Sequence, residues 1–288
     1  EKQKAAGTAP NKSRKKNSKE ASTVTTAAKK PEIKYDSITI NILNADNKVI
    51  RTIKRKAPKE NGMHRTYWGL DEKSAPRPSR NEARRNGRQR GGLSVLPGTY
   101  TVKMHFGNQT TTTTIKVAYD PRVEMPFEVL KAKYDLLKEI QDKGAVLAKA
   151  SQRLVESKKI VQDYQKRIKE HGKKDKNDAL LKQHKELIKK IDGLQDDMFG
   201  KVDNRQGITS NEFPSNISYL NLAARYVGSL ISMPGETEAT LMKNADAKIK
   251  PLVDKINEFF ATDWVEYQES VENLKLTPFK KQEALKFE

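Results

Sequence analysis

The segment 75–92 carries most of the side chains in this sequence that could bind an anion. Six arginines occur there among proline, asparagine and glycine: Arg77, Arg80, Arg84, Arg85, Arg88 and Arg90. Three lysines form a second basic group farther along: Lys173, Lys174 and Lys176. A guanidinium group can hold a phosphate or carboxylate through two parallel hydrogen bonds. These nine residues are therefore the candidate binding site for an anion or an acidic partner.

The segment 75–92 has a plainer interpretation as a mobile, soluble connection between strands. It contains no aromatic side chain on which a nucleic-acid base would stack. Glycine-rich basic connections of this kind are common between strands. The sequence leaves both interpretations open.

Residues with catalytic or metal-binding chemistry are sparse elsewhere. The chain has no cysteine, which excludes disulfides, thiolate nucleophiles and cysteine-bound zinc. No Gly-x-Ser-x-Gly elbow, Walker loop or dinucleotide fingerprint is present. The four histidines include no pair at metal-ligand spacing on one element: His64, His105, His171 and His184. We therefore expect no metal and no cofactor, and we expect His184 at the edge of a helical core.

Carboxylates provide no convincing acid pair for glycosidic cleavage, the reaction that two facing carboxyl groups would support. Asp196 and Asp197 are neighbours on an expected helix, so their side chains should point in different directions. Asp120 is better explained by a helix start near Pro121. We expect no enzyme activity in this chain itself.

Basic charge is concentrated in three parts of the 288-residue chain. Lysine and arginine number 56 against 37 aspartates and glutamates, a formal charge of +19. The excess lies in the segments 1–36, 72–92 and 158–190. Such a field attracts nucleic acid, acidic glycan or an anionic membrane face, and it weakens as salt rises. The alternative is that these charges merely solvate tails and helix faces.

The residues from 37 to 122 are expected to form strands. Ile38, Ile40 and Ile42 alternate with polar residues, as a half-buried strand requires. Further strands are expected over 48–53, 64–70, 99–106 and 109–118. Their number and spacing predict a small antiparallel sandwich of the immunoglobulin type. Residues 1–36 hold too few apolar side chains to fold, and we interpret them as a basic, low-complexity tail or linker.

The pattern changes to a helical period from residue 127. Five apolar residues recur at every seventh position: Ile140, Leu147, Leu154, Val161 and Ile168. A second apolar series steps by three and four residues: Leu180, His184, Leu187, Ile191, Leu194 and Met198. The two series predict a long, coiled-coil-like hairpin of antiparallel helices. Shorter helices are expected near 216–232, 236–259 and 263–274, so residues 123–288 are predicted to form a helical bundle. The chain as a whole is predicted to be a multi-domain α+β protein.

Four segments together resemble a known family: Ile42–Ile53, Gly62–Leu70, Leu96–Lys103 and Asp120–Arg122. They are similar to the C-terminal region of bacterial sortilin-like propeller proteins of the Bacteroidetes type, often labelled glycosyl hydrolases with Asp-box (BNR) repeats. That family places a β-propeller before an immunoglobulin-like domain and a helical domain. The resemblance covers about residues 37–125, and it carries no hydrolase residue onto this sequence because the propeller is not part of it.

The resemblance implies a secreted, periplasmic or cell-surface protein of a bacterium. A start at Glu1 without an apolar signal segment fits either a processed secreted protein or a piece of a longer one. Our leading hypothesis is a non-catalytic interaction module that braces a propeller or another protein. The alternatives are a basic module that binds an acidic polymer or membrane surface, and an accessory part of a glycoside hydrolase whose active site lies outside this chain. The sequence leaves the oligomeric state open, and no apolar run is long enough to span a bilayer.

Overall fold

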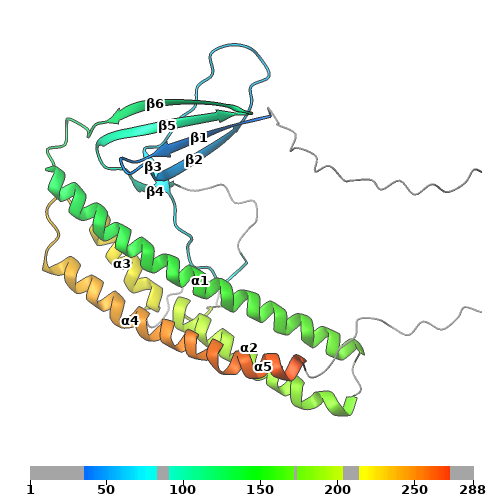
Figure 1. Cartoon of the computed structure of the whole chain (residues 1–288). Coiled ribbons are helices and arrows are strands. Elements are labelled where there is room, and N and C mark those ends of the chain that lie inside the picture. Colours follow the sequence, from blue (N-terminus) through cyan, green and yellow to red (C-terminus); the bar gives the residue numbers. More distant parts are fainter. Residues whose placement is uncertain (1–35, 83–90, 172–173, 204–213, 273–288) are drawn as a thin grey trace, which may run out of the picture.

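The computed structural model describes residues 36–82, 91–171, 174–203 and 214–272. Within these residues, six strands lie between Ser37 and Val117 and five helices lie between Phe127 and Glu272. Figure 1 shows the sheet lying over the first part of the long helix α1, with the other helices on the opposite side of α1. The expectation of a mixed α and β protein is therefore confirmed, whereas the domain boundaries at residues 36 and 122 stay predictions.

The larger sheet has four antiparallel strands in the order β2–β1–β5–β6. Their bounds are Ser37–Leu43 for β1, Val49–Lys56 for β2, Gly98–Phe106 for β5 and Gln109–Val117 for β6. The β1–β2 turn is held by the Asn44 side chain, whose Oδ1 accepts from the backbone N–H groups of Asp46 (3.1 Å) and Lys48 (2.9 Å). In the β5–β6 turn, Gly107 adopts a φ of +57°, which glycine tolerates without a steric cost.

The alternation of side chains gives this sheet one apolar and one polar face. The register places Ile40 opposite both Ile53 and Met104. On the other face, Thr52 donates to Asn41 Oδ1 at 2.9 Å. The predicted alternation of β1 is therefore confirmed.

A second sheet of two short strands, β3 (Asp71–Lys73) and β4 (Gly91–Ser94), lies against the apolar face. Arg51, on that face, donates to the backbone carbonyl of Glu72 at 3.0 Å. Gly92 permits the close pairing of the two strands, because a Cβ there would lie 2.8 Å from the Lys73 carbonyl oxygen. This small sheet covers only part of the face, so an immunoglobulin-like sandwich is not established by the strands described.

The strand expected over residues 64–70 is absent, and that prediction was wrong. Leu70 adopts a φ of +54°, a left-handed conformation that interrupts an extended strand. Trp68 instead turns its indole inward, where Nε1 donates to the Asp71 carbonyl at 2.8 Å and the ring contacts Tyr100 edge-on at 5.6 Å. The aromatic residue that should have filled a sandwich therefore closes a turn.

The helices are α1 (Phe127–His171), α2 (Lys174–Phe199), α3 (Asn216–Ser229), α4 (Glu236–Ala261) and α5 (Asp263–Glu272). All five seam residues of α1 are buried, with exposed fractions of 6% or less. Helix α2 returns along α1, as the ion pair between Lys158 and Asp192 at 2.5 Å shows. The helical bundle and its antiparallel hairpin are as predicted. Asp120 precedes α1 by seven residues, so the expected helix start near Pro121 was wrong.

The five helices share one hydrophobic core. Polar contacts fasten its edges: Lys133 Nζ donates to the Leu230 carbonyl at the end of α3 (3.0 Å), and Lys143 pairs with Asp246 of α4. Helix α4 begins where Glu238 Oε2 accepts from the Gly235 backbone N–H at 2.8 Å. The bundle thus has a shared hydrophobic core, whereas the described strands bury few hydrophobic residues.

Two valines of α1 test how much the buried seam contributes to the stability of the fold. Val161 is fully buried whereas Val146 is 49% exposed, so the same substitution removes a core contact at one position only. We expect Val161→Ala to lower the free energy of unfolding by about 2 kcal/mol. Val146→Ala should change it by less than about 0.5 kcal/mol. Urea unfolding followed by circular dichroism measures both free energies. Equal losses of stability in the two variants would contradict the burial of the seam.

Candidate functional site

The first part of the arginine-rich segment is fixed to the helical bundle. We call residues 74–82, which lead from β3 onto α1, the strap (Figure 1). The backbone N–H of Ser79 donates to Ser151 Oγ of α1 at 3.3 Å, and Glu82 pairs with Lys159 at 2.7 Å. The expectation of a mobile loop over 75–92 is therefore wrong for the strap, and also for Gly91 and Gly92, which belong to β4.

Arg80 is the strap residue with the most contacts. Its guanidinium pairs with Asp196 at 3.0 Å and donates to the Gly200 carbonyl at the end of α2. It also lies over the Phe199 ring, 5.3 Å from the ring centre. The two hydrogen bonds use Nη1 and Nη2 of the guanidinium, and the charge is paired with Asp196. Arg80 is thus a latch between strap and bundle, which is a different role from the predicted anion site.

The structure does not bring the other predicted basic residues into one described site. Arg77 is exposed on the strap. Lys174 and Lys176 begin α2, but their side chains fall outside the described part of the chain. The remaining predicted residues also lie outside it: Arg84, Arg85, Arg88, Arg90 and Lys173.

The strap and the helical turn lie at different places along α1. The strap ends beside Lys159, whereas α1 continues for another twelve residues to His171. At 1.5 Å per residue, the last strap contact and the end of α1 are about 18 Å apart. The last described strap contact and the end of α1 are therefore separate places on the helix.

Three cavities lie beside the strap. One of about 750 Å³ is lined on the helix side by Ala148, Gln152, Val155, Glu156 and Ile160. Another of about 600 Å³ lies between the strap, β4, α1 and α3. Their walls mix apolar and charged side chains, and the strap's own acid in the first cavity, Glu82, is paired with Lys159. Glu156 is the second acid of that cavity, and the 600 Å³ cavity has no acid among its described lining residues. The third cavity, of about 450 Å³, is mainly basic: Arg80, Lys158, Lys159 and Lys166 line it together with Glu82 and Asp163.

Asp196 and Asp197 serve separate structural contacts. Asp196 pairs with Arg80 of the strap, and Asp197 pairs with Lys255 of α4 at 3.3 Å. Their predicted divergence is confirmed. Among the described residues, no group of three or more histidines, cysteines or acids is arranged to hold a metal ion.

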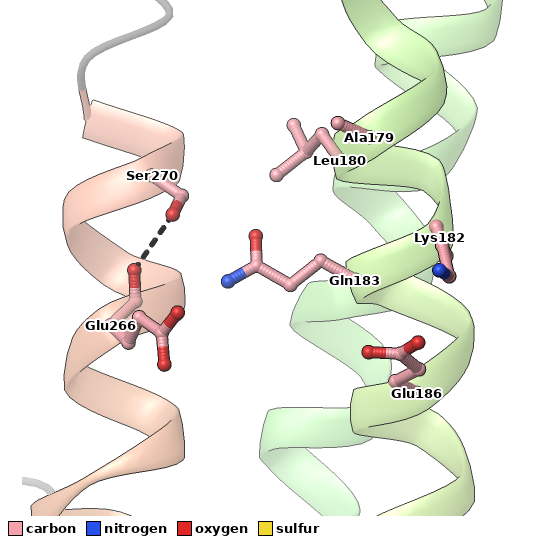
Figure 2. Close-up of a pocket in the computed structure, with 7 residues that line it drawn as sticks. All are labelled: Ala179, Leu180, Lys182, Gln183, Glu186, Glu266 and Ser270. Carbon is pink, nitrogen blue, oxygen red and sulfur yellow. Dashed lines mark hydrogen bonds between the residues drawn. The ribbon is translucent and has the colours of Figure 1, made fainter.

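Another cavity, of about 460 Å³, separates α2 from α5. Figure 2 shows Gln183 reaching from α2 toward α5, where Ser270 donates to the Glu266 carbonyl at 2.8 Å. The two acids at this cavity, Glu186 and Glu266, belong to different helices. No arrangement for proton transfer or nucleophilic attack is formed by the residues drawn there.

His184, also at the α2–α5 contact, is buried more deeply than expected. Its exposed fraction is 0%, so the prediction of a core-edge histidine was wrong. The ring contacts Tyr267 edge-on at 5.2 Å, and neither ring nitrogen has a hydrogen-bond partner among the described residues. Burial lowers the pKa of His184. Burial, followed by the nearby Tyr164, raises the pKa of Tyr267. The sequence spacing placed His184 on the seam but contained no sign of its missing partners.

The β part has several exposed apolar side chains that sequence reasoning missed. Met63 and Tyr67 are 101% and 70% exposed, and Met104 on the apolar face is 37% exposed. Among the described hydrophobic residues of the β part, Ile42 and Tyr100 alone are buried. The alternation of side chains in β5 could have placed Met104 on the apolar face. Its exposure could not be predicted, because the sequence indicated a covering strand over 64–70 that the structure lacks.

Comparisons with known proteins identified no relative. No protein-family description, curated protein or solved structure matches this chain. None of the helices described has both the length and the apolar character needed to cross a membrane.

Two arginines of the strap provide a matched test of the latch. Arg80→Ala removes the contacts with Asp196, Gly200 and Phe199, whereas Arg77→Ala changes an exposed side chain. We expect Arg80→Ala to cost about 1 to 2 kcal/mol and Arg77→Ala almost nothing. Hydrogen exchange of residues 74–82 should rise in the first variant only. Unchanged protection of the strap in Arg80→Ala would contradict the latch.

Burial of His184 predicts a loss of stability in mild acid. Its folded pKa lies below the ordinary value of 6.5, so the unfolded chain takes up the proton first. The stability due to neutral His184 is complete above pH 6.5 and falls as the pH drops toward the folded pKa. Urea midpoints measured from about pH 7.5 to about pH 5.5 should fall in the wild type and fall less in His184→Leu. His64→Leu, at an exposed position, should keep the wild-type slope; a wild-type slope in His184→Leu would contradict this account.

Proposed function

We propose that this chain is a non-catalytic structural module of a secreted or surface multi-domain bacterial protein, and that it braces a neighbouring β-propeller or partner protein. The observation that carries the proposal is the incomplete core of the β part. Its described strands bury only Ile42 and Tyr100 among their hydrophobic residues, while Met63, Tyr67 and Met104 remain exposed.

A sheet with so little core gains from being covered by another surface. Small units bury a low fraction of their apolar area, and a patch of exposed apolar side chains marks an interaction site more often than a free surface. Methionine and tyrosine adapt well to a partner, because one is flexible and the other offers a rigid ring with a polar end. The apolar face near Met104 is therefore the proposed contact surface.

The strap gives this surface a fixed orientation. Ser79 and Glu82 contact α1, Arg80 contacts α2, and Tyr134 of α1 donates to the carboxylate of Glu72 in β3. A partner held on the sheet would thus be held at a set angle to the helical bundle. Rigid placement of one surface relative to another is what a bracing module requires.

We also propose that the β part has an immunoglobulin-like fold. Tyr100, near the start of β5, donates its hydroxyl to the Leu96 carbonyl at 2.7 Å. Immunoglobulin-like sandwiches have a similar tyrosine corner. Together with the resemblance to the region that follows sortilin-like, Asp-box propellers, this contact supports an immunoglobulin-like origin for the β part. The seven-residue seam of α1 supports a coiled-coil-like character for the hairpin.

A second candidate function, binding of an acidic polymer or an anionic membrane face, rests on α2. Lys182, Lys185 and Lys189 are spaced by three and four residues, so they share one helix face. All three are exposed, and no ion pair joins them to another described residue. A glycosidase role would belong to the parent protein, with this chain as its accessory part.

The proposal is tested with any sequence that the parent gene encodes upstream of residue 1. We expect a propeller there, and we expect the purified propeller to bind this chain when added separately. Replacing both Tyr67 and Met104 by serine should weaken binding at least about tenfold, or about 1.4 kcal/mol. Val265→Ser, at a 42% exposed position on α5, is the control and should have no effect.

A salt series distinguishes the two candidate functions. Contact through the apolar face should survive raised salt, whereas binding through lysines should fall steeply. Absence of a propeller, lack of binding, or cleavage of a glycan by the isolated chain would each contradict the bracing role. Steep salt dependence with loss of binding in a Lys182, Lys185 and Lys189 to glutamine variant would favour the second candidate.

A further inference from the structure

The outer edge of β6 is a long strand edge without a partner among the described residues. Strand β6 pairs with β5 on one side only, through a register without a bulge from Gln109 to Val117. No other described strand or helix packs on it, and residues 109–114 are all exposed. Such an edge presents a row of backbone donors and acceptors to any strand that approaches it.

Strand β6 lacks the features that normally protect an edge. It contains no proline, and its single charged residue, Lys116, is next to last. The opposite edge, β2, is protected in several ways. It carries Arg51, Lys54, Arg55 and Lys56, its pairing with β1 includes a bulge, and Arg51 ties it to β3. The same sheet therefore has one edge built against pairing and one edge open to it.

The β5–β6 turn shows which backbone groups point outward. The turn has two residues, so the pair that flanks it, Phe106 and Gln109, exchanges hydrogen bonds within the hairpin. Because the direction alternates, Thr111 and Thr113 also bond inward. The N–H and C=O groups of Thr110, Thr112, Thr114 and Lys116 consequently point to the open edge.

We propose that a second copy of this chain pairs with the open edge, β6 against β6 in antiparallel orientation, with Thr113 opposite Thr113. This register brings all nine residues of the strand into the pairing. Thr112 then lies opposite Thr114, and Thr110 lies opposite Lys116. The outward backbone N–H and C=O groups of one copy therefore face those of the other copy. The two sheets become one continuous eight-stranded sheet related by a two-fold axis.

Charge and composition favour a second copy over another occupant. The register opposes no two like charges, because Lys116 faces Thr110 rather than itself. The five consecutive threonines form a self-complementary row, and threonine pairs stabilise neighbouring strands. Each copy carries a formal charge of +19, so the contact should form where charge is lowest, and β6 is such a place. The interface is small, which predicts a reversible dimer.

Salt should act on this dimer in the opposite sense to its effect on anion binding. Screening reduces the repulsion between two copies of the same positive charge, so raised salt strengthens the dimer. Binding of an acidic polymer weakens under the same change. The dimer does not depend on the bracing role, because it uses the edge of β6 whereas the partner contact uses the apolar face near Met104.

A charge exchange at the two-fold axis tests both the dimer and its register. Thr113 of each copy lies at a non-hydrogen-bonded position, where the facing side chains are closest. Sedimentation velocity at rising protein concentration should show a dimer of the full wild-type chain. Thr113→Lys alone and Thr113→Glu alone should each weaken the dimer at least tenfold. An equimolar mixture of the two variants should recover it.

Backbone variants provide an independent measurement. Thr112→Pro removes an outward donor and leaves the pairing with β5 complete, so it should abolish the dimer, whereas Thr112→Val should retain it. Lysine and glutamate variants of Thr240, an exposed residue of α4 outside the sheet, are controls and should behave as wild type. Circular dichroism of each variant reports its folding.

Three results would overturn the proposal. The first is a wild-type chain that stays monomeric at every concentration, which would also be the outcome if a different protein occupied the edge. The second is a mixture of the Thr113 variants that dimerises no better than either variant alone. The third is a Thr112→Pro chain that dimerises as tightly as wild type. The bracing role would be unaffected by all three, since its test measures binding of the propeller.

Discussion

The contacts between the two parts of this molecule depend on one surface of α1. Tyr134, Ser151 and Lys159 all lie on this helix, and each contacts a residue of β3 or of the strap. That surface is held in place from the other side, where the seam residues of α1 are buried against α2, α3 and α4. The apolar seam therefore determines more than the stability of the bundle, because it also keeps the docking surface of the sheet in position.

The sheet and the bundle differ in how they are stabilised. The bundle contains nearly all of the buried hydrophobic residues described, and its ion pairs lie at its edges. The sheet depends on backbone pairing, on two buried hydrophobic side chains and on polar contacts with its neighbour. Such a sheet is suited to binding a partner in a fixed position, because much of its apolar face is still available for contact.

Local spacing explains which features could be predicted from the sequence. Seven-residue repeats and alternating isoleucines are set by the geometry of a helix and a strand, so the seam and β1 were found from residue types alone. The latch was not found, because Arg80 and Asp196 are 116 residues apart and nothing near either residue indicates the other. The left-handed Leu70 is equally hidden, since leucine has no preference for that conformation. Seven of the nine predicted basic residues cannot be related to a site, because their side chains, in the segments 83–90 and 172–173 or at Lys174 and Lys176, fall outside the described residues.

The long separation between the strap and its anchor has a consequence for the order of folding. The α1–α2 hairpin joins residues that are close in the sequence, so its closure is fast, whereas the Arg80 latch must close a loop of more than a hundred residues. During synthesis the sheet leaves the ribosome first, while the helix that will anchor it has not yet been made. We therefore expect the Arg80 latch of the nascent chain to stay open until α2 emerges, an interval in which the strap is not yet fastened to that helix.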